Sequence, residues 1–182
     1  MTSAALLVAS ILYGAVTPVT TSDPFQRAAL SVIRNPQGAP RWKVDLMVGA
    51  LKRGVSAHHR LRLTYYCYHC AGRICADGSP VRHGVCAFST NVPRHSIVWV
   101  EGNGLRLCTD VGGAIHTRQS AKYGFRSACD IWVPDCCTRR RWKGSETRQS
   151  VPWALVMVGD GMKNRNSNRH PVNDFERALS TY

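Results

Sequence analysis

The fold is decided by residues 104–115, which read GLRLCTDVGGAI. Within this stretch, residues 105–108 are predicted to form a short strand that follows a glycine turn. The turn EGNG at residues 101–104 precedes this strand, and the apolar run IVWV at residues 97–100 precedes the turn. The stretch therefore predicts a β-hairpin that leads to Asp110 and then to a pair of glycines.

Short strands continue on both sides of this hairpin. Runs rich in β-forming residues stand at residues 61–66, 131–133 and 153–158, separated by Gly, Pro and Asn. Many short strands with such turns between them are typical of a closed or nearly closed barrel. We expect residues 61–158 to form a six-stranded barrel core with little helix.

The two ends of the chain have a different pattern. Asp23 and Pro24 can start a short helix that runs to Ile33, and residues 42–51 place apolar side chains at helical spacing. Residues 23–60 are therefore predicted to be a linker or an arm packed on the main domain. Residues 159–182 are polar and basic, and we expect them to form a tail.

Several segments, in register, resemble the three-aspartate domain of bacterial cell-wall lytic enzymes. The resemblance covers residues 61–158, and its most specific motif is DVGGAI at residues 110–115. The other similar segments are residues 64–66, 86–93, 97–102, 130–133 and 153–158. The resemblance implies a mainly β fold: a six-stranded double-psi β-barrel, disulfide-rich, with an N-terminal arm and a short C-terminal tail.

The resemblance also implies a function and a site. The best-known proteins of this kind are lytic transglycosylases, which cut the glycan strands of peptidoglycan without a cofactor or a metal. Asp130 falls on the family's catalytic acid and Asp110 on its supporting aspartate. The family's first aspartate has no acidic counterpart, because its place falls near Phe88 or Ser89. The loop between Ile115 and Asp130 is also longer than is usual in the family.

Glycoside cleavage needs a carboxylic acid that is still protonated when it meets the leaving oxygen. An ordinary Asp is ionised at neutral pH, so apolar walls or a second carboxylate must raise its pKa. Ile131 and Trp132 follow Asp130 directly and could provide such walls. In a lytic transglycosylase the same acid then takes a proton from the sugar's own hydroxyl, so no second nucleophilic carboxylate is needed.

Substrate contacts are expected from Gly112, Gly113, Trp132 and Trp99. Adjacent glycines allow a close backbone approach to a ligand, and the indole rings can stack on sugar faces. Each of these residues also has a structural alternative. The glycines can make a tight turn, the tryptophans can be core residues, and Asp110 and Asp130 can cap turns.

The chain is strongly basic, with 24 Lys and Arg against 11 Asp and Glu and a formal net charge of +13. Such a surface attracts polyanions, among them anionic wall polymers and nucleic acid. The densest basic run contains Arg139, Arg140, Arg141 and Lys143. A second hypothesis therefore stands beside the enzyme: a catalytically inactive barrel that binds glycan or an anionic polymer.

Eight cysteines lie between Cys67 and Cys137. An even number at this density favours disulfides, and we expect at least three bridges. The alternative is a zinc site that includes Cys67, His69 and Cys70 in a nucleic-acid-binding protein.

The first residues are apolar. Residues 1–22 resemble a secretory signal, although no basic residue stands near the start, and a buried amphipathic helix is the alternative. With the cysteines, this pattern predicts a secreted or cell-envelope protein. No run of apolar residues is long enough to predict a membrane span.

Overall fold

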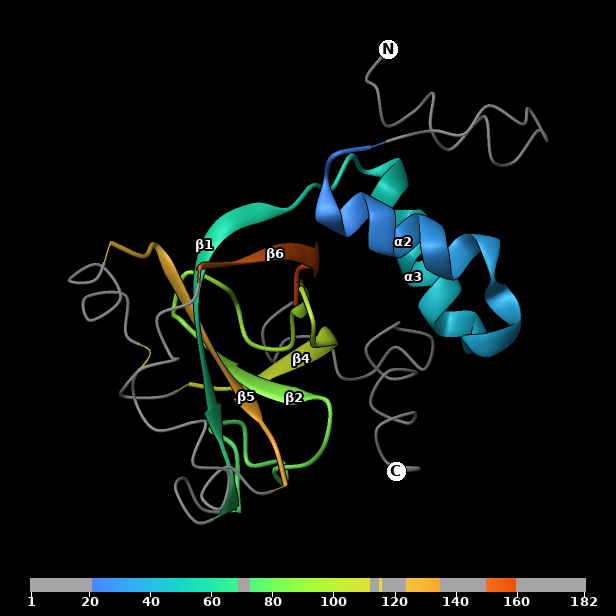
Figure 1. The fold of residues 1–182 in the computed structure, drawn as a ribbon. Coiled ribbons are helices and arrows are strands. Elements are labelled where there is room, and N and C mark those ends of the chain that lie inside the picture. The colour runs from blue at the N-terminus through green and yellow to red at the C-terminus, as the bar shows by residue number, and fades with distance from the viewer. Residues whose placement is uncertain (1–20, 69–72, 112–114, 116–123, 135–149, 160–182) are drawn as a thin grey trace.

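A computed structural model of the chain describes residues 21–68, 73–111, 115, 124–134 and 150–159 (Figure 1). Within these residues the fold is mainly β, with six strands and few helices. The helical elements come first, and they are α2 (Pro24–Arg34), the 3-10 turn η1 (Pro36–Gly38) and α3 (Arg41–Lys52). The strands are β1 (His58–Tyr66), β2 (Val85–Phe88), β3 (Ile97–Val100), β4 (Gly104–Asp110), β5 (Ser127–Trp132) and β6 (Ser150–Met157).

The six strands form one sheet whose pairing closes into a ring in the order β1-β5-β2-β4-β3-β6, with β6 pairing back to β1. Two of the pairs are parallel, β1 with β5 and β2 with β4. The other four pairs are antiparallel. Because parallel neighbours cannot be joined by a tight turn, the ring pairs segments far apart in the sequence.

Five of the six strands overlap the runs predicted from the sequence, although β5 begins four residues before its predicted run at residues 131–133. The strand that periodicity missed is β2. Its four residues, from Val85 to Phe88, are all buried. A strand buried on both faces shows no alternation, so its sequence does not differ from that of any other short apolar run. The predicted six-stranded, mainly β architecture is confirmed.

The interior of the ring is filled by side chains that alternate inward along the strands. Leu61 and Leu63 of β1 and Cys129 and Ile131 of β5 point inward, together with Phe88 of β2. The remaining buried members of this interior cluster are Cys86, Val92, Val98, Val100, Cys108 and Trp153. Since strand side chains alternate, the residues between them face outward.

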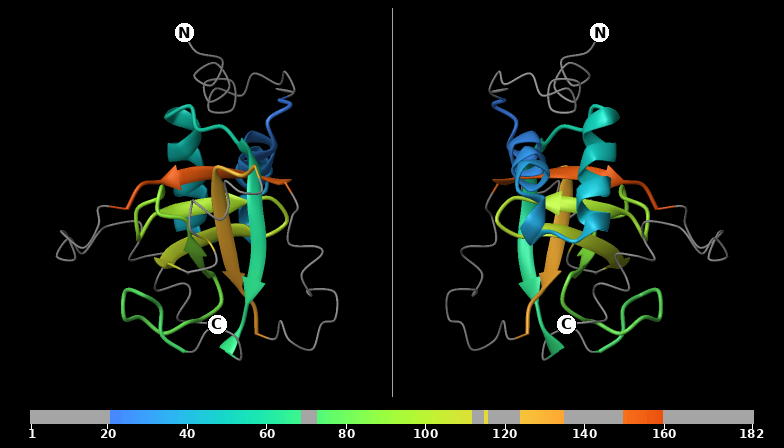
Figure 2. Two further views of the ribbon diagram at one scale, coloured as in Figure 1. Left: turned by 90° about the vertical axis from the view of Figure 1, so that its left-hand side faces the viewer. Right: turned by 90° about the vertical axis from the view of Figure 1, so that its right-hand side faces the viewer.

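Helices α2 and α3 cover the outer side of the ring formed by β3, β4 and β6 (Figure 2). Phe25 of α2 packs edge-on against Trp99 of β3, with ring centroids 5.7 Å apart. Asp23 caps α2 by accepting a hydrogen bond from Gln26 N at 2.9 Å. Its other oxygen accepts from Ala57 N at 2.8 Å, at the start of β1. Of the predicted arm at residues 23–60, residues 23–57 form a helical arm packed on the sheet, and residues 58–60 already belong to β1.

The expected disulfide-rich character is not confirmed. In the structure Cys75, Cys86, Cys108 and Cys129 carry free thiols, and no disulfide joins any of these four. Cys86, Cys108 and Cys129 fill the ring interior as small apolar side chains, which is a common use of a buried cysteine. Cys70, Cys136 and Cys137 lie outside the described residues.

Two further sequence expectations concern metals and membranes. Among the described residues, no group of three or more His, Cys, Asp or Glu side chains could hold a metal ion. His69 and Cys70 of the zinc alternative lie outside those residues. In the described part of the chain, no helix is long and apolar enough to cross a membrane. Residues 1–20 and 160–182, which include the predicted signal and most of the predicted tail, are not described.

The packing of α2 on the sheet can be tested at Phe25, which is fully buried. We expect Phe25→Ala to lower the free energy of unfolding by about 3–5 kcal/mol, since a large cavity opens over Trp99. Urea unfolding followed by tryptophan fluorescence measures the change. Arg41→Ala is the matched control, because it removes only the exposed pair with Asp45 and should change stability by less than about 0.5 kcal/mol. Equal stability of the two variants would contradict the described packing.

Candidate functional site

The two predicted aspartates lie in one row across the sheet. Asp130 of β5 and Asp110 of β4 both pair with Ala87 of β2, one from each side. On its other side Asp130 pairs with Thr64 of β1. Asp110 and Asp130 are therefore two strand spacings apart, about 10 Å between Cα atoms. Because Cys129 and Ile131 face the interior, Asp130 faces outward.

The carboxyl group of Asp130 is largely buried, and this determines its acidity. Burial, opposed by a hydrogen bond with Thr64, raises its pKa from 3.8 to about 6. The Cys86 thiol and the charge of Asp110 add to the rise, whereas the charge of Arg62 opposes it. Asp130 Oδ1 is buried without a hydrogen-bond partner among the described residues. The site thus holds a carboxyl that is protonated in part near neutral pH.

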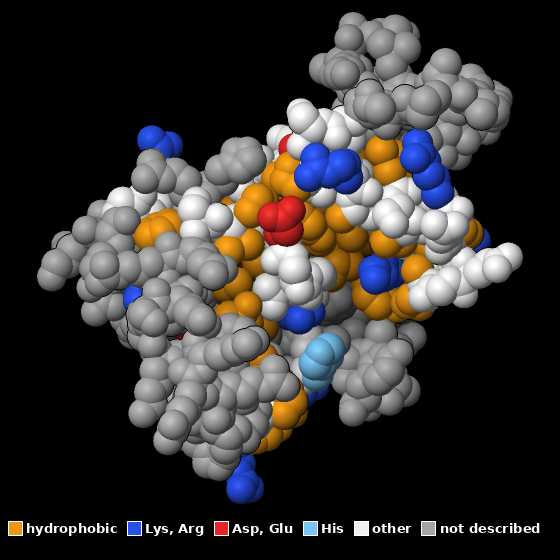
Figure 3. All heavy atoms as spheres, viewed as in Figure 1, with side chains coloured by type: hydrophobic (Ala, Val, Ile, Leu, Met, Phe, Trp, Pro, Cys, Tyr) orange, Lys and Arg blue, Asp and Glu red, His pale blue; other side chains and the backbone are white. Residues whose placement is uncertain are grey.

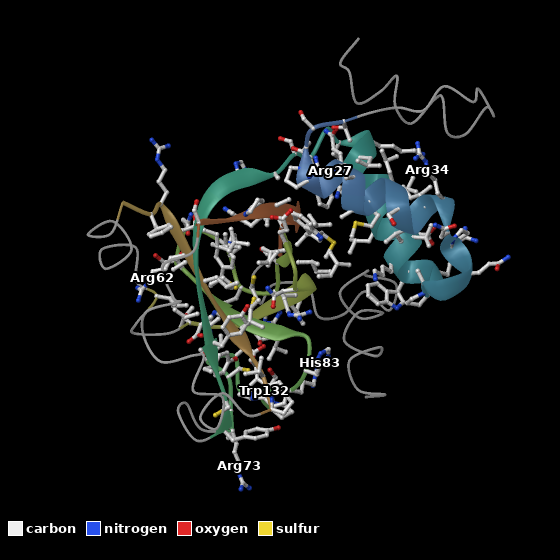
Figure 4. The ribbon with its side chains drawn as sticks, viewed as in Figure 1. Arg27, Arg34, Arg62, Arg73, His83 and Trp132 are labelled. Carbon is white, nitrogen blue, oxygen red and sulfur yellow. The ribbon has the colours of Figure 1, made fainter. Side chains whose placement is uncertain are left out.

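An apolar wall stands next to Asp130 on the outer face of β1 and β5. Tyr66 pairs with Trp132, two residues farther along each strand than the Thr64–Asp130 pair and therefore on the same face. The wall consists of Tyr66, Cys75, Val81, Val85 and Trp132. Figure 4 shows Arg62 and Trp132 on the side of the ring away from α2 and α3.

Two polar atoms in this wall also lack partners among the described residues, namely the hydroxyl of Tyr66 and Nε1 of Trp132. Burial, followed by the neighbouring Cys75 and Asp110, raises the pKa of Tyr66 far above its ordinary value, so its hydroxyl keeps its proton. Buried donors of this kind are normally paired. Tyr66 and Trp132 thus share with Asp130 one face of β1 and β5, and each of the three has a buried polar atom without a partner among the described residues.

Asp110 has a structural task as well. Its Oδ1 accepts hydrogen bonds from Ala76 N at 2.9 Å and from Val111 N at 2.8 Å. The first bond ties the segment 73–81 to the end of β4, and this segment carries Cys75 and Val81 of the apolar wall. Asp110 therefore positions the wall and acts on Asp130 only through its charge.

The segment 73–81 has further anchors that the sequence did not reveal. His95 Nε2 lies 3.1 Å from Asp77 Oδ2, and Arg94 Nη1 donates to Ala76 O at 3.1 Å. Asp77 Oδ1 also accepts from Ser79 N at 2.9 Å, which confirms the turn predicted there. The wall beside Asp130 is thus fixed to β4 and to the turn before β3.

Ser89 stands near the place of the missing aspartate, and its hydroxyl is engaged in the fold. Ser89 Oγ donates to Asn91 Oδ1 at 2.6 Å and accepts from Ala128 N at 3.1 Å. These bonds extend the β2–β5 pairing beyond the end of β2. The side chain is buried. Ser89 therefore adds neither an acid nor a free hydroxyl to the site.

The structure separates the predicted substrate contacts. Trp132 lies in the wall beside Asp130, although Tyr68 packs on it with ring centroids 5.2 Å apart. Trp99 is buried beneath α2, so the prediction that it stacks on substrate is wrong; its alternative as a core residue is the observed one. Gly112 and Gly113 lie outside the described residues, as do Arg139, Arg140, Arg141 and Lys143.

The sequence reasoning missed Tyr66 and Thr64 as site residues. Both belong to the predicted strand at residues 61–66, and their spacing of two puts them on one face. Which face that is, and that Asp130 and Trp132 lie beside them, depends on the parallel pairing of β1 with β5. Residues of a parallel pair are distant in sequence, so strand patterns alone could not have identified the two residues.

Comparison with known proteins assigns no family to the chain. No family model, no curated protein and no solved structure matches it. The resemblance to the three-aspartate domain therefore stays a prediction, and the functional argument depends on the geometry around Asp130.

The raised pKa of Asp130 makes stability depend on pH in a definite direction. The folded protein holds this proton up to about pH 6, whereas the unfolded chain loses it near 3.8, so wild-type stability falls as the pH rises through this window. At pH 7 the ionised group is buried and destabilising, and Asp130→Asn removes that charge. We expect the variant to be more stable than wild type at pH 7 by about 1–3 kcal/mol and equal to it below about pH 4.

Denaturant unfolding of both proteins between pH 3.5 and 8 measures this difference. Asp45→Asn is the matched control, since it makes the same chemical change at an exposed position of α3. The control should follow the wild-type curve within about 0.5 kcal/mol. A stability gain of Asp130→Asn that is the same at every pH would contradict the assignment.

Proposed function

We propose that this protein cleaves glycan strands of the cell-wall type, with Asp130 as the acid and base of a lytic transglycosylase-like reaction. The observation that carries the proposal is the buried, outward-facing Asp130 carboxyl, with its pKa near 6 and an unpartnered oxygen. General acids of enzymes need a pKa close to the working pH, and ordinary surface aspartates do not have one. The proposal places the protein outside the cytoplasm, where such glycans occur.

The proposed fold is a double-psi β-barrel. Support comes from the closed order of the six strands and from the two parallel pairs, β1 with β5 and β2 with β4. In this arrangement β5 lies between β1 and β2, and the two aspartates end up on strands that flank β2. The three-aspartate resemblance assigns both residues to one site, and the row Asp130–Ala87–Asp110 agrees with that assignment.

In the proposed reaction, protonated Asp130 donates its proton to the glycosidic oxygen as the bond to the sugar carbon breaks. The Asp130 carboxylate then accepts a proton from a hydroxyl of the same sugar, and that oxygen closes an internal ether on the cationic carbon. Asp130 is therefore protonated again at the end of the reaction. No second carboxylate must act as nucleophile, in contrast to ordinary retaining glycosidases. This suits a site in which Asp110 Oδ1 is bonded to Ala76 and Val111.

Tyr66 and Trp132 fit the task of positioning the sugar. Each has a buried polar hydrogen without a partner among the described residues, next to an aromatic surface. A sugar ring has hydroxyl groups at its edge and C–H groups on its faces, so it can use both kinds of contact. Burial of the site also keeps water from competing for the proton of Asp130.

The alternative function is a barrel that binds an anionic wall polymer without cleaving it. It is favoured by the net charge of +13 and by Ser89, whose hydroxyl is tied to Asn91 and Ala128 where the family has an acid. On the face in Figure 3, the Lys and Arg side chains of the described residues are scattered over the helices and the sheet and do not gather in one patch. Such a distribution fits diffuse, salt-sensitive attraction to a polyanion better than one specific anion site.

The enzyme proposal is tested by incubating the purified protein with peptidoglycan and identifying the soluble products by mass spectrometry. We expect fragments with an internal ether, which lack the mass of one water relative to hydrolysis products. Asp130→Asn should lower the rate by about 10²–10⁴-fold, because the amide keeps the shape and loses the transferable proton. Asp110→Asn is the matched control, since its amide oxygen can still accept from Ala76 N, and we expect a loss below about tenfold.

The pH dependence provides a second measurement on the same reaction. Because the acid must be protonated, the rate should fall as the pH rises above about 6. Undiminished cleavage by Asp130→Asn would show that another group is the acid. Sedimentation with peptidoglycan that weakens with salt, without products from wild type, would replace the enzyme with the binding protein.

A further inference from the structure

Three thiols meet in the interior of the ring, on three neighbouring strands. Cys86 of β2 lies between Cys108 of β4 and Cys129 of β5, and all three are buried in the same cluster. The three thiols face the interior and are not proposed to exchange a proton with the glycan, although Cys86 adds to the raised pKa of Asp130.

Cys86 and Cys108 are placed as a pair that can form a disulfide. They are direct partners in the parallel β2–β4 pairing, and their Sγ atoms are in contact at 3.7 Å. Adjacent strands are about 4.8 Å apart, within the Cα separation of about 4.4–6.8 Å that disulfides span. Both side chains already point to the same side, so small rotations about their Cα–Cβ bonds suffice to bring the sulfurs together.

Cys129 is not in an equivalent position. In the antiparallel β2–β5 pairing, Cys86 is opposite Ile131 and Cys129 is opposite Phe88, so the two cysteines are diagonal neighbours. Diagonal Cα atoms are about 7–8 Å apart, which is beyond the usual reach of a disulfide. Cys108 and Cys129 are separated by the whole of β2. Of the three possible bridges inside the ring, geometry permits one.

The surroundings also select which thiol reacts first. Burial raises the pKa of Cys108 and of Cys129. Burial acts on Cys86 in the same direction, but hydrogen bonds from Cys108 and Cys129 and the nearby charge of Arg106 outweigh it and lower its pKa to about 5. The thiolate is the nucleophile in disulfide exchange, so Cys86 is the attacking group.

We propose that Cys86 and Cys108 are a redox pair that closes into a disulfide by exchange with an external disulfide while the chain folds. The Cys86 thiolate attacks the external disulfide and releases one thiolate. Cys108, after losing its proton to solvent, then attacks Cys86 Sγ and releases the second. Two protein thiols are oxidised and one external disulfide is reduced to two thiols. Exchange takes place once β2 has paired with β4 and β5, which gives Cys86 its hydrogen-bond partners, and before β1 and β6 close the ring, because both residues are almost completely buried afterwards.

The bridge would fix the sheet next to the candidate site. The register of β2 and β4 shifts by a bulge directly after the Cys86–Cys108 pair, and this shift places Ala87 opposite Asp110. Asp110 in turn holds Ala76 and the wall beside Asp130. A covalent link at residue 86 therefore holds β4 at the point from which Asp110 is positioned.

The test refolds the full chain in a buffer of reduced and oxidised glutathione, blocks the remaining thiols in denaturant, and maps tryptic peptides without reduction. Trypsin separates the three cysteines, since Cys86 lies on peptide 83–94, Cys108 on peptide 107–118 and Cys129 on peptide 127–139. Peptide 127–139 also carries Cys136 and Cys137, so fragmentation of this peptide in the mass spectrometer assigns the state of Cys129. We expect a linked peptide that joins 83–94 to 107–118, with Cys129 blocked as a thiol. Blocked thiols on both Cys86 and Cys108, or a link from Cys86 to 127–139, would overturn the proposal.

Matched variants separate the bridge from mere packing. Cys108→Ala and Cys129→Ala remove the same atoms from the same cluster, but only the first removes a partner of the bridge. We compare how far the Tm of each oxidised protein falls when a reductant is added. For wild type and for Cys129→Ala this decrease should be roughly 10 °C larger than for Cys108→Ala. An equal response of the two variants would overturn the proposal, as would zinc bound in stoichiometric amount by all three thiols.

Discussion

The parallel pairing of β5 with β1 is the constraint on which the rest of the structure depends. It joins residues 61–66 to residues 127–132 in register, across more than sixty positions of chain. The pairing puts Thr64 beside Asp130 and Tyr66 beside Trp132, and it leaves the other edge of β5 free for β2. With β2 in place, the second parallel pair and the hairpin of β3 and β4 extend the sheet, and β6 closes the ring by pairing with both β3 and β1. Entropy makes such distant contacts costly, so they form only because the closed sheet buries a continuous interior.

Because the sheet closes into a ring, the side chains of each strand lie in two chemical environments, one inside the ring and one outside it. Inward positions such as Leu63, Cys86 and Ile131 have no access to water and are apolar or carry thiols. The outer surface is divided again, because α2 and α3 cover β3, β4 and β6, whereas no helix of the described residues covers the β1–β5 side. Asp130 lies on that side. The arm at residues 23–57 therefore contributes stability on one side, and the candidate chemistry is confined to the other.

Asp130 shows how such a site trades stability for reactivity. A buried carboxyl without a partner for one oxygen is unfavourable in a folded protein, above all when it is ionised. The same burial raises the pKa of the group to about 6, so a part of it keeps its proton near neutral pH, as the proposed acid requires. Asp110 differs from Asp130 in its hydrogen bonds, since its Oδ1 accepts from two backbone N–H groups. Two aspartates in one row thus have separate roles because their hydrogen-bond partners differ.

The sequence by itself determined the strands with alternating patterns, both helices of the arm, the turn at Asp77 and the two aspartates as candidates. These features are local, because they depend on the spacing of apolar residues, on capping and on short motifs. Only the tertiary structure decided that β2 is a strand, that Trp99 is covered by Phe25, and that Tyr66 stands beside Asp130. It also decided that Cys86 faces Cys108, which cysteine counting could not reveal. The physical reason is the same in each case: these contacts join segments distant in sequence, and only the closed sheet brings them together.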